Sequence, residues 1–310
     1  MRAVVVDPQA PLGMRLDQVD IPVPGPGQVL IEAHHVSLNR GDLNDARSGR
    51  VAAGAVLGSD VAGVVVRASK NPDGPPVGTP VVALAAGAFA QKVVADVEAL
   101  AVVPEGVDLA TVATLPVAGL AAVQALRAGL LETPLKGARV LVTGASGGVG
   151  RFATQLAAYG GAHVIAVVGD ASRVEELTAI GADEVVTELD AIDEPVDLVL
   201  DNVGGAQLVA AWALLAPGGN VQCIGASSGE PSTFPAYATV GPSKSLSSFL
   251  ITGPVASDLG ALVRLVETGS LRADIAWRGP LARIGEAAQA MLDRRISGKA
   301  VLDVLPPSRS

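Results

Sequence analysis

The sequence is poor in cysteine, aromatic residues and basic clusters, and the shortages of cysteine and of basic clusters each exclude a class of protein. Of its 310 residues only Cys223 is a cysteine, so neither an internal disulfide nor a cysteine-rich zinc site can form. Aromatic residues make up 3%, and the formal net charge is −9 with no cluster of Lys and Arg to offset it. This charge balance argues against a partner with a phosphate backbone, such as a nucleic acid.

Long hydrophobic runs are also missing. No apolar run reaches the roughly 18 residues that a membrane-spanning helix requires. The first ten residues, MRAVVVDPQA, turn polar too early for a signal peptide, so we expect a cytoplasmic protein. The surrounding residues NVQCIGAS indicate a strand, which predicts that Cys223 is a small, buried hydrophobic residue.

Small aliphatic residues and glycine are abundant, and they form two patterns. Residues 1–113 contain short strand-like runs, such as QVLIEAHHVSL and AGVVVRA, separated by Gly and Pro. From ARVLVTG onward, strand-like and helix-like stretches alternate, which is typical of parallel βαβ units. The end of the chain contains a helix-like IGEAAQAMLDRRISG and a strand-like KAVLDVL. The pattern predicts an α/β protein.

The stretch VLVTGASGGVGRFATQLAAYGG, residues 140–161, predicts a dinucleotide-binding loop. RVLVT is expected to be a buried strand, and Gly160 and Gly161 are expected to end the helix that follows the loop. The apolar stripe of that helix consists of Val149, Phe152, Ala153, Leu156 and Ala157. A glycine turn at this place lets backbone N–H groups and the positive end of the helix approach a pyrophosphate, which a Cβ would prevent.

The glycines of this loop fit two families of dehydrogenase. Read as T-G-x-x-x-G-x-G they match short-chain dehydrogenases, and read as G-x-x-G-x-x-G they are close to zinc-free quinone oxidoreductases. A short-chain dehydrogenase carries this loop near its N-terminus and needs a Tyr-x-x-x-Lys pair. Here about 140 residues precede the loop, Tyr159 is followed by His163, and Tyr237 is followed by Gly241. The short-chain hypothesis therefore fails.

Nearly the whole chain resembles the medium-chain dehydrogenase/reductase superfamily, specifically its zinc-independent quinone oxidoreductase branch. The segments that carry the resemblance are VSLNRGDLNDARSG, LGSDVAGVV, LPVAGLAAVQAL, VDLVLDNVGG, LLAPGGNVQCIG and ISGKAVLDV. The resemblance implies a GroES-like, β-rich catalytic domain formed by residues 1–113 and 257–310. It also implies a Rossmann domain with a doubly wound parallel sheet over residues 114–256, and a cleft that holds the nicotinamide between the domains.

The places that bind catalytic zinc in alcohol dehydrogenases of this superfamily carry other residues here. The resemblance puts Asn39, Ser59 and Thr114 where those enzymes have Cys, His and Cys, and none of the three is a good zinc ligand. His34 and His35 are neighbours in a strand-like run, so we expect them to point to opposite faces. We therefore expect no metal site and an acceptor that is already electron-poor.

The resemblance also suggests which nicotinamide cofactor binds. The place where NAD enzymes carry an acid against the ribose is Val168, and without that acid the site permits a 2′-phosphate. Gly169 leaves room for the phosphate, and Arg173 can bind it. The further candidate contacts to the cofactor are Ser146, Gly147, Gly148, Val149, Asn202, Gly225, Phe249 and Leu250. NADPH is therefore the expected cofactor.

Other residues near this site leave NADH open as the alternative. Asp170 disfavours a phosphate, and Glu188 stands where some relatives use a tyrosine. The run SRVE also fits a capping box with Ser172 as the cap, in which Arg173 would be an exposed residue of the first helical turn.

Asn39, Asp42 and Asn44 are the candidate catalytic residues, because the resemblance places them on the loop that faces the nicotinamide. Asn39 can hydrogen-bond the ribose or the substrate carbonyl, whereas Asp42 equally fits a helix cap with Asp45 at N3. Asn44 matches a tyrosine of many relatives, and Asn can donate a hydrogen bond but cannot supply a proton. This departure weakens the case for an enoyl-thioester reductase.

The leading hypothesis is an NADPH-dependent oxidoreductase that transfers hydride to a quinone or an α,β-unsaturated carbonyl without a metal. The alternatives are a non-catalytic NADPH-binding protein, structural or sensory, and an enoyl reductase of a biosynthetic pathway. Residues 245–253, SLSSFLITG, predict an apolar strand at the edge of the Rossmann sheet. Relatives pair this edge with a second subunit, so we expect a homodimer, with Phe249 and Leu250 near the edge and the nicotinamide.

Overall fold

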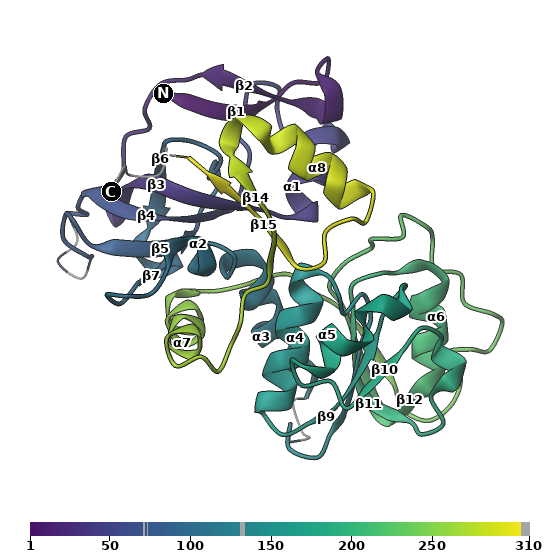
Figure 1. Ribbon diagram of the computed structural model, residues 1–310. Helices are drawn as coiled ribbons and strands as arrows, with labels where there is room; N and C mark the ends of the chain where they lie inside the picture. The colour runs from purple at the N-terminus through teal and green to yellow at the C-terminus, as the bar shows by residue number, and fades with distance from the viewer. Residues whose placement is uncertain (71, 73, 131–133, 305–310) are drawn as a thin grey trace. The chain divides into compact units, whose positions relative to one another are not determined.

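The structure is a computed structural model that describes residues 1–70, 72, 74–130 and 134–304. The chain divides into two compact units (Figure 1). The first unit comprises Met1–Leu120 and Thr252–Ser310, and the second comprises Ala121–Ile251. The domain boundaries expected from the resemblance stay a prediction.

The first unit is built on a seven-stranded sheet whose short strands are rich in Val and Ala. Its strands are β3 (Gln28–Leu38), β4 (Asp60–Arg67), β5 (Pro80–Leu84), β6 (Lys92–Asp96), β7 (Leu100–Val102), β14 (Ile275–Pro280) and β15 (Lys299–Asp303). The order is β14-β15-β3-β4-β5-β7, with β6 paired to β3, and only β14 and β15 run parallel to each other. β15 thus brings the end of the chain against β3.

A hairpin and several helices complete the first unit. The hairpin pairs β1 (Arg2–Val6) with β2 (Met14–Gln18). The helices are α1 (Arg40–Ser48), α2 (Leu109–Val112), α3 (Pro116–Gly129), which continues into the second unit, α7 (Ala256–Glu267) and α8 (Ile284–Leu292). The apolar core joins sheet residues such as Ile31 and Leu38 to Leu43 of α1 and to Phe89, all nearly inaccessible to solvent. This packing fixes the start of α1 against β3.

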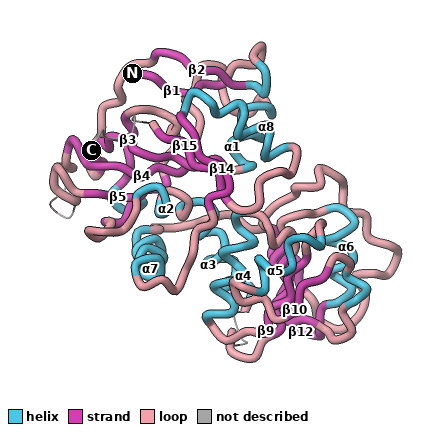
Figure 2. Tube along the Cα trace, viewed as in Figure 1, coloured by secondary structure: helices cyan, strands magenta, loops and turns pink. Residues whose placement is uncertain are grey.

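The second unit is a six-stranded parallel sheet in the order β10-β9-β8-β11-β12-β13. The strands are β8 (Arg139–Val142), β9 (His163–Val167), β10 (Glu184–Val186), β11 (Val196–Asp201), β12 (Leu215–Cys223) and β13 (Ser245–Ser248). Figure 2 shows α4 (Gly148–Tyr159) and α5 (Val174–Thr178) on one side of this sheet and α6 (Gly205–Leu214) on the other. The predicted α/β fold class, a GroES-like β-rich domain together with a parallel Rossmann sheet, is confirmed.

The chain reverses its direction of winding between β8 and β11, and ligands of open α/β sheets bind at such a switch point. Single turns of 3-10 helix occur at η1 (Pro11–Gly13), η2 (Val97–Ala99), η3 (Ala171–Arg173), η4 (Leu189–Ala191) and η5 (Leu281–Arg283). Helix α4 ends with Gly160 as its C-cap, as expected. Its buried surface is wider than the expected stripe, because Arg151, Thr154 and Gln155 are buried as well.

Two local expectations for β12 and β13, the last two strands of this sheet, were wrong. Cys223 lies in a strand but is only half-buried, because it is the last residue of β12, the strand next to the edge of the sheet. Strand β13 ends at Ser248 and contains a single large apolar residue, Leu246. Phe249 and Leu250 follow this strand rather than belonging to it, and 78% of Leu250 is exposed.

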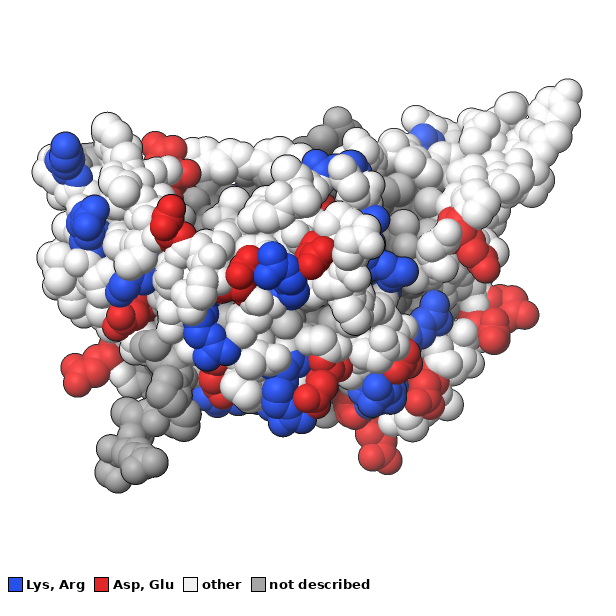
Figure 3. Space-filling view, turned by 90° about the horizontal axis from the view of Figure 1, so that it is seen from above, with Lys and Arg blue, Asp and Glu red and all other residues white. Residues whose placement is uncertain are grey.

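The surface agrees with the composition. On the face shown in Figure 3, Lys and Arg are interspersed with Asp and Glu, so this face has no continuous basic patch. Among the described residues, no helix combines the length and apolar character needed to cross a membrane.

Candidate functional site

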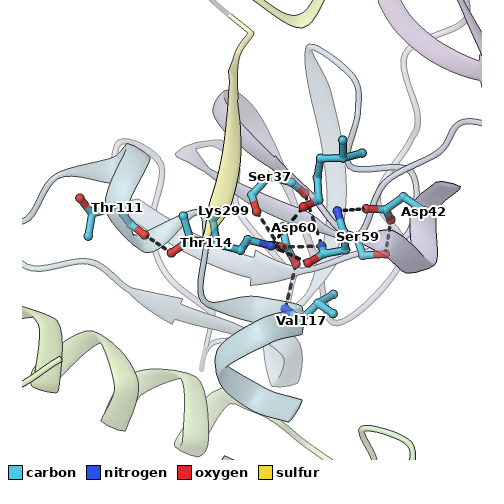
Figure 4. Close-up of polar contacts among 10 residues, drawn as sticks. Ser37, Asp42, Ser59, Asp60, Thr111, Thr114, Val117 and Lys299 are labelled. Atoms are coloured by element: carbon cyan, nitrogen blue, oxygen red, sulfur yellow. Dashed lines mark hydrogen bonds and ion pairs between the residues drawn. The ribbon is translucent and has the colours of Figure 1, made fainter. Parts of the chain in front are cut away.

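Buried polar side chains of the first unit gather around Asp60, at the start of β4 (Figure 4). This carboxylate is fully buried and accepts hydrogen bonds from Ser37 Oγ at 3.0 Å and from Asn39 Nδ2 at 2.8 Å. The backbone N–H of Val117, in the first turn of α3, donates to its other oxygen at 2.8 Å. Lys299 Nζ lies 3.3 Å from Asp60 Oδ2 and completes an ion pair that is almost inaccessible to solvent.

Strand register brings these residues together from distant parts of the chain. Ser37 lies opposite Asp60 in the β3–β4 pair, and Ala300 lies opposite Leu38 in the β15–β3 pair. Lys299 therefore reaches the end of β3 and donates to the backbone carbonyl of Leu38 at 3.3 Å. Burying two charges costs several kcal/mol, and this cost is offset only when the pair is well hydrogen-bonded, as it is here.

Asn39 is held firmly by this network. Its Nδ2 donates to Asp60, and also to the carbonyl of Ser37 at 3.4 Å, while its Oδ1 accepts from Lys299 Nζ at 2.5 Å. Every polar atom of the side chain thus has a partner inside the chain. The contact that we expect Asn39 to make with the ribose or the substrate stays a prediction. A donor to a substrate carbonyl requires one of the two Nδ2 bonds to open, whereas Oδ1 can accept a second hydrogen bond, for example from a ribose hydroxyl.

Asp42 is part of a capping box, but not as its N-cap. Asn39 is the N-cap of α1 and Asp42 is residue N3, whose Oδ2 accepts from the backbone N–H of Asn39 at 2.7 Å. The sequence-based alternative with Asp42 as cap and Asp45 at N3 was therefore wrong, because the capping box lies three residues earlier. The reason is that helical geometry already begins at Arg40, directly after the extended Asn39.

The second oxygen of Asp42 faces Ser59. Ser59 Oγ donates to Asp42 Oδ1 at 3.1 Å, and Asp42 is 4% exposed whereas Ser59 is half-buried (Figure 4). Burial, together with the negative charge of Asp60, raises the pKa of Asp42 to about 7. Hydrogen bonds from Asn39 and Ser59 and the charge of Lys299 act in the opposite direction. Both protonation states of Asp42 are thus accessible at neutral pH.

Asn44 lies two residues after Asp42 on α1 and is exposed. It lines an open hollow of about 420 Å³ together with Arg47, Ser48 and Arg50. Of the three candidate catalytic residues, Asn39 belongs to the network around Asp60 and Asp42 is bonded to Asn39. Asn44 lies at the surface.

The residues at the zinc-binding places do not fit a zinc ion. Asn39 is bonded to Asp60 and Lys299, Ser59 is bonded to Asp42, and the buried Thr114 donates from Oγ1 to the carbonyl of Thr111 at 2.6 Å. A neutral amide and two hydroxyls are poor ligands for zinc, which prefers thiolate, imidazole and carboxylate.

The two adjacent histidines do not form a joint metal site. The ring centroids of His34 and His35 lie 6.5 Å apart, and His35 Nδ1 is 2.8 Å from a carboxylate oxygen of Asp303. Burial lowers the pKa of His35, against the opposing effect of Asp303. In the described part of the chain, no group of three His, Cys, Asp or Glu side chains is placed to hold a metal ion.

The glycine loop of the second unit is shaped for an anionic ligand. Gly147 is the N-cap of α4 and has no side chain to cap the helix, so the first-turn N–H groups are left to a ligand. A Cβ on Gly150 would lie 2.4 Å from the carbonyl oxygen of Gly144, which itself has φ +59°. The loop therefore crosses the helix start at a distance that only glycine permits. The candidate residues here, Ser146, Gly147, Gly148 and Val149, are all half-buried.

Thr143 and Asp201, which the sequence analysis missed, fix the switch point together with the predicted cofactor contact Asn202. Asp201, fully buried at the end of β11, accepts from Thr143 Oγ1 at 2.6 Å and from the N–H of Gly204 at 2.9 Å. Asn202 Nδ2 donates to the carbonyl of Thr143 at 2.9 Å, so the ends of β8 and β11 are tied together. The signal was present, because each apolar strand, RVLV and VDLVL, is followed by a polar residue at its carboxyl end.

Gly225 packs against this switch point. A Cβ there would lie 2.9 Å from the carbonyl oxygen of Asn202. Close backbone packing therefore explains this glycine, while its contact with a cofactor stays a prediction.

Arg173 follows β9 and is half-buried. Its Nη1 lies 3.3 Å from Glu176 Oε1, and the other oxygen of Glu176 lies 2.9 Å from Arg151 Nη1. The expected cap Ser172 was wrong, because the carboxylate of Asp170 caps η3 by accepting from the Ser172 N–H at 2.9 Å. Gly169 is exposed, and a Cβ placed on it would meet no atom within 4 Å, so there is room beside it.

Comparisons with known proteins agree with this architecture. Residues 25–105 match the family described as "Alcohol dehydrogenase GroES-like domain", and residues 148–268 match "Zinc-binding dehydrogenase". The chain is 32% identical, over 94% of both chains, to the "Chloroplast envelope quinone oxidoreductase homolog" of Arabidopsis thaliana.

Two solved structures are similar over nearly the full length. One is a mycobacterial protein complexed with NADPH, with 26% identity, TM-score 0.87, and coverage of 98% of this chain and all of the other. The second is an NAD-dependent alcohol dehydrogenase, with 27% identity, TM-score 0.88 and the same coverage. One of these structures is described with NADPH and the other as NAD-dependent, so the comparisons do not decide between the two cofactors.

Proposed function

Because this chain belongs to the medium-chain dehydrogenase/reductase superfamily, and is similar along its length to quinone oxidoreductases, we propose that it is an NADPH-dependent reductase of quinones or α,β-unsaturated carbonyls. The observation that carries the proposal is the set of residues at the zinc-binding places. Asn39, Ser59 and Thr114 are neutral and already hydrogen-bonded within the chain, so they supply no Lewis acid. An acceptor that is already electron-poor needs none.

In this proposal, NADPH supplies the hydride and the chain binds, orients and shields the reactants. The first-turn N–H groups of α4 bind the pyrophosphate, and the tie between Thr143, Asp201 and Asn202 keeps the switch point rigid. The candidate contacts Phe249 and Leu250 follow β13 at the carboxyl edge of the same sheet. Positioning of the acceptor is then the main contribution of the protein to the rate.

The proposal is tested by following NADPH absorbance with a quinone, an enone, an enoyl thioester and, in reverse, a secondary alcohol. We expect turnover of the quinone and the enone, weak turnover of the thioester because Asn44 replaces a tyrosine, and no alcohol oxidation. A chelator should leave the rates unchanged. Alcohol oxidation alone would overturn the proposal, turnover of the thioester alone would favour a biosynthetic enoyl reductase, and NADPH binding without turnover a non-catalytic protein.

The preference for NADPH depends on Arg173. Arg173→Ala is expected to weaken NADPH binding and to leave NADH nearly unaffected, because only NADPH carries the 2′-phosphate. A charge-assisted bond contributes on the order of 1.5–3 kcal/mol, which is about ten- to hundred-fold in Kd. Titration of both cofactors into the variant measures the effect.

Arg283→Ala is the matched control for this change. Arg283 also pairs with a glutamate three residues on, Glu286, but it lies on the surface of the first unit. It should change neither affinity. An equal loss of NADPH and NADH affinity in Arg173→Ala would rule out the phosphate contact.

We also propose a homodimer formed through β13. Among the described strands, β13 pairs only with β12, and Leu246, Tyr237, Val240 and Leu250 expose much of their apolar surface in this part of the second unit. Wild-type protein should sediment as a dimer at micromolar concentration, and Leu246→Asp should shift it to monomer. The control Tyr159→Asp, at an exposed residue on α4, should remain dimeric. A monomeric wild type would disprove the assembly.

The cytoplasmic location stays a prediction. The relative from Arabidopsis thaliana is named for the chloroplast envelope, so location differs within the family, and fractionation of the source cells is the measurement that decides it.

A further inference from the structure

We propose that Ser59 and Asp42 form a proton relay, in which the Ser59 hydroxyl gives a proton to the reduced substrate and the Asp42 carboxyl replaces it. This inference rests on the proposed reductase function and deepens it. The resemblance places Ser59 where alcohol dehydrogenases of the superfamily have a zinc ligand, and the structure leaves Ser59 half-buried beside the buried Asp42. The relay provides the proton that Asn44 cannot give.

The hydrogen bonds of Asp42 determine where its proton lies. Asp42 Oδ2 is 2.7 Å from the backbone nitrogen of Asn39, and an N–H can only donate. When Asp42 is protonated, its proton must therefore be on Oδ1, which is 3.1 Å from Ser59 Oγ. The neutral carboxyl then donates to Ser59, and the Ser59 hydroxyl is turned away from Asp42 to donate elsewhere. The ionised carboxylate instead accepts from Ser59 and withdraws this donor.

The two buried carboxyl groups have different partners. Lys299 on β15 binds Asp60 directly, so Asp60 is paired with a cation, whereas the hydrogen-bond partners of Asp42 among the described residues are the N–H of Asn39 and the hydroxyl of Ser59. The groups that act on Asp42 are Asp60 on β4 and Lys299 on β15, with the N–H of Asn39 and the hydroxyl of Ser59. Burial and Asp60 raise the pKa of Asp42 to about 7.

The solvent exposure of Asp42 and Ser59 also fits a relay. Asp42 is 4% exposed and therefore cannot reach the substrate itself, whereas Ser59 is half-buried. In the relay, Ser59 is therefore the group placed to contact the substrate, and the proton of Asp42 leaves through Ser59.

The steps balance with the hydride from NADPH. As hydride reaches the acceptor, negative charge develops on the carbonyl oxygen. The O–H bond of Ser59 breaks and its proton forms a new O–H bond on that oxygen, which gives a hydroquinone or an enol. The Oδ1–H bond of Asp42 breaks and its proton passes to Ser59 Oγ. Asp42 is left as a carboxylate and regains a proton from water through Ser59.

The pH profile of kcat tests the relay. Because Asp42 must be protonated, kcat of the wild type with an enone should be constant below about pH 7 and should fall about tenfold per pH unit above it. Asp42→Asn and Ser59→Ala should each lower kcat by about a hundredfold, the lower end of the range for general acid catalysis, and should abolish this break. The double variant should be no slower than either single one, because the two groups act as a unit.

Further variants separate the relay from a structural role. Ser59→Thr keeps the hydroxyl and should restore most of the rate and the break. Ser37→Ala removes a hydroxyl that donates to Asp60, on the other side of the network, and should keep the break near pH 7. The Kd for NADPH should be the same in all these variants. Carbon-13 NMR titration of the cofactor-free protein should show one Asp carboxyl that titrates near pH 7 and is lost in Asp42→Asn.

The possible outcomes distinguish failure of the relay from failure of the proposed reductase function. If the wild type reduces enones but Ser59→Ala retains its rate and its break, the relay is wrong and the reductase function stands. If Asp42 titrates near pH 4 in the NMR experiment, the relay is also wrong. If no acceptor consumes NADPH, the reductase function fails, and the relay fails with it.

Discussion

Lys299→Met is expected to lower the free energy of unfolding by about 3–5 kcal/mol, the usual loss when one partner of a buried ion pair is removed. Lys299 is 3% exposed, and its partner Asp60 is completely buried. Without the ammonium group, Asp60 remains as a buried carboxylate with only neutral donors, and Asn39 Oδ1 loses the hydrogen bond from Lys299. Denaturant unfolding at pH 7 measures the loss.

Lys92→Met is the matched control for this prediction. Lys92 Nζ lies 2.9 Å from Glu32, but the side chains are 27% and 39% exposed. A pair so accessible to water contributes about 0–1 kcal/mol. Comparable losses in the two variants would mean that burial is not what makes the Lys299–Asp60 pair costly to break.

Gly150→Ala is expected to damage both the fold and the cofactor site of the second unit. The new Cβ would lie 2.4 Å from Gly144 O and 2.6 Å from Ala145 Cα, and both are backbone atoms that cannot turn aside. Overpacking of this kind costs about 1–3 kcal/mol, and the loop must move away from the start of α4. We therefore also expect NADPH affinity to fall by about tenfold or more, about 1.4 kcal/mol.

Gly285→Ala is the control for the loss of glycine itself. Gly285 is exposed in the first turn of α8, and a Cβ there would meet no atom within 4 Å. Alanine in a helix is more stable than glycine by about 0.5–1 kcal/mol, so this variant should be slightly stabilised and should bind NADPH normally. Normal stability and affinity of Gly150→Ala would show that the loop tolerates a side chain and does not need its glycines.

The sequence by itself determined the architecture of the second unit, because the signals for it are local. The alternation of strands and helices and the glycine turn at Gly147–Gly150 depend on neighbours within about 30 residues. Parallel βαβ units follow from such patterns with little freedom in handedness. Errors occurred where two polar residues compete for one cap. Asn39 and Asp42 both fit the N-cap of α1, and Asp170 and Ser172 both fit that of η3, and backbone geometry chose the earlier residue each time.

Only the tertiary structure decided how the network around Asp60 is arranged. Lys299 and Asp60 are 239 residues apart, and they meet because β15 pairs with β3, which pairs with β4. The spacing of residues in the sequence does not predict this pairing, because strands can pair whatever their separation along the chain. The sequence showed Ser59 as a residue unsuited to zinc and Asp42 as a possible cap. Their contact, and the burial beside Asp60 that gives Asp42 a pKa of about 7, exist only once the sheet has brought them together.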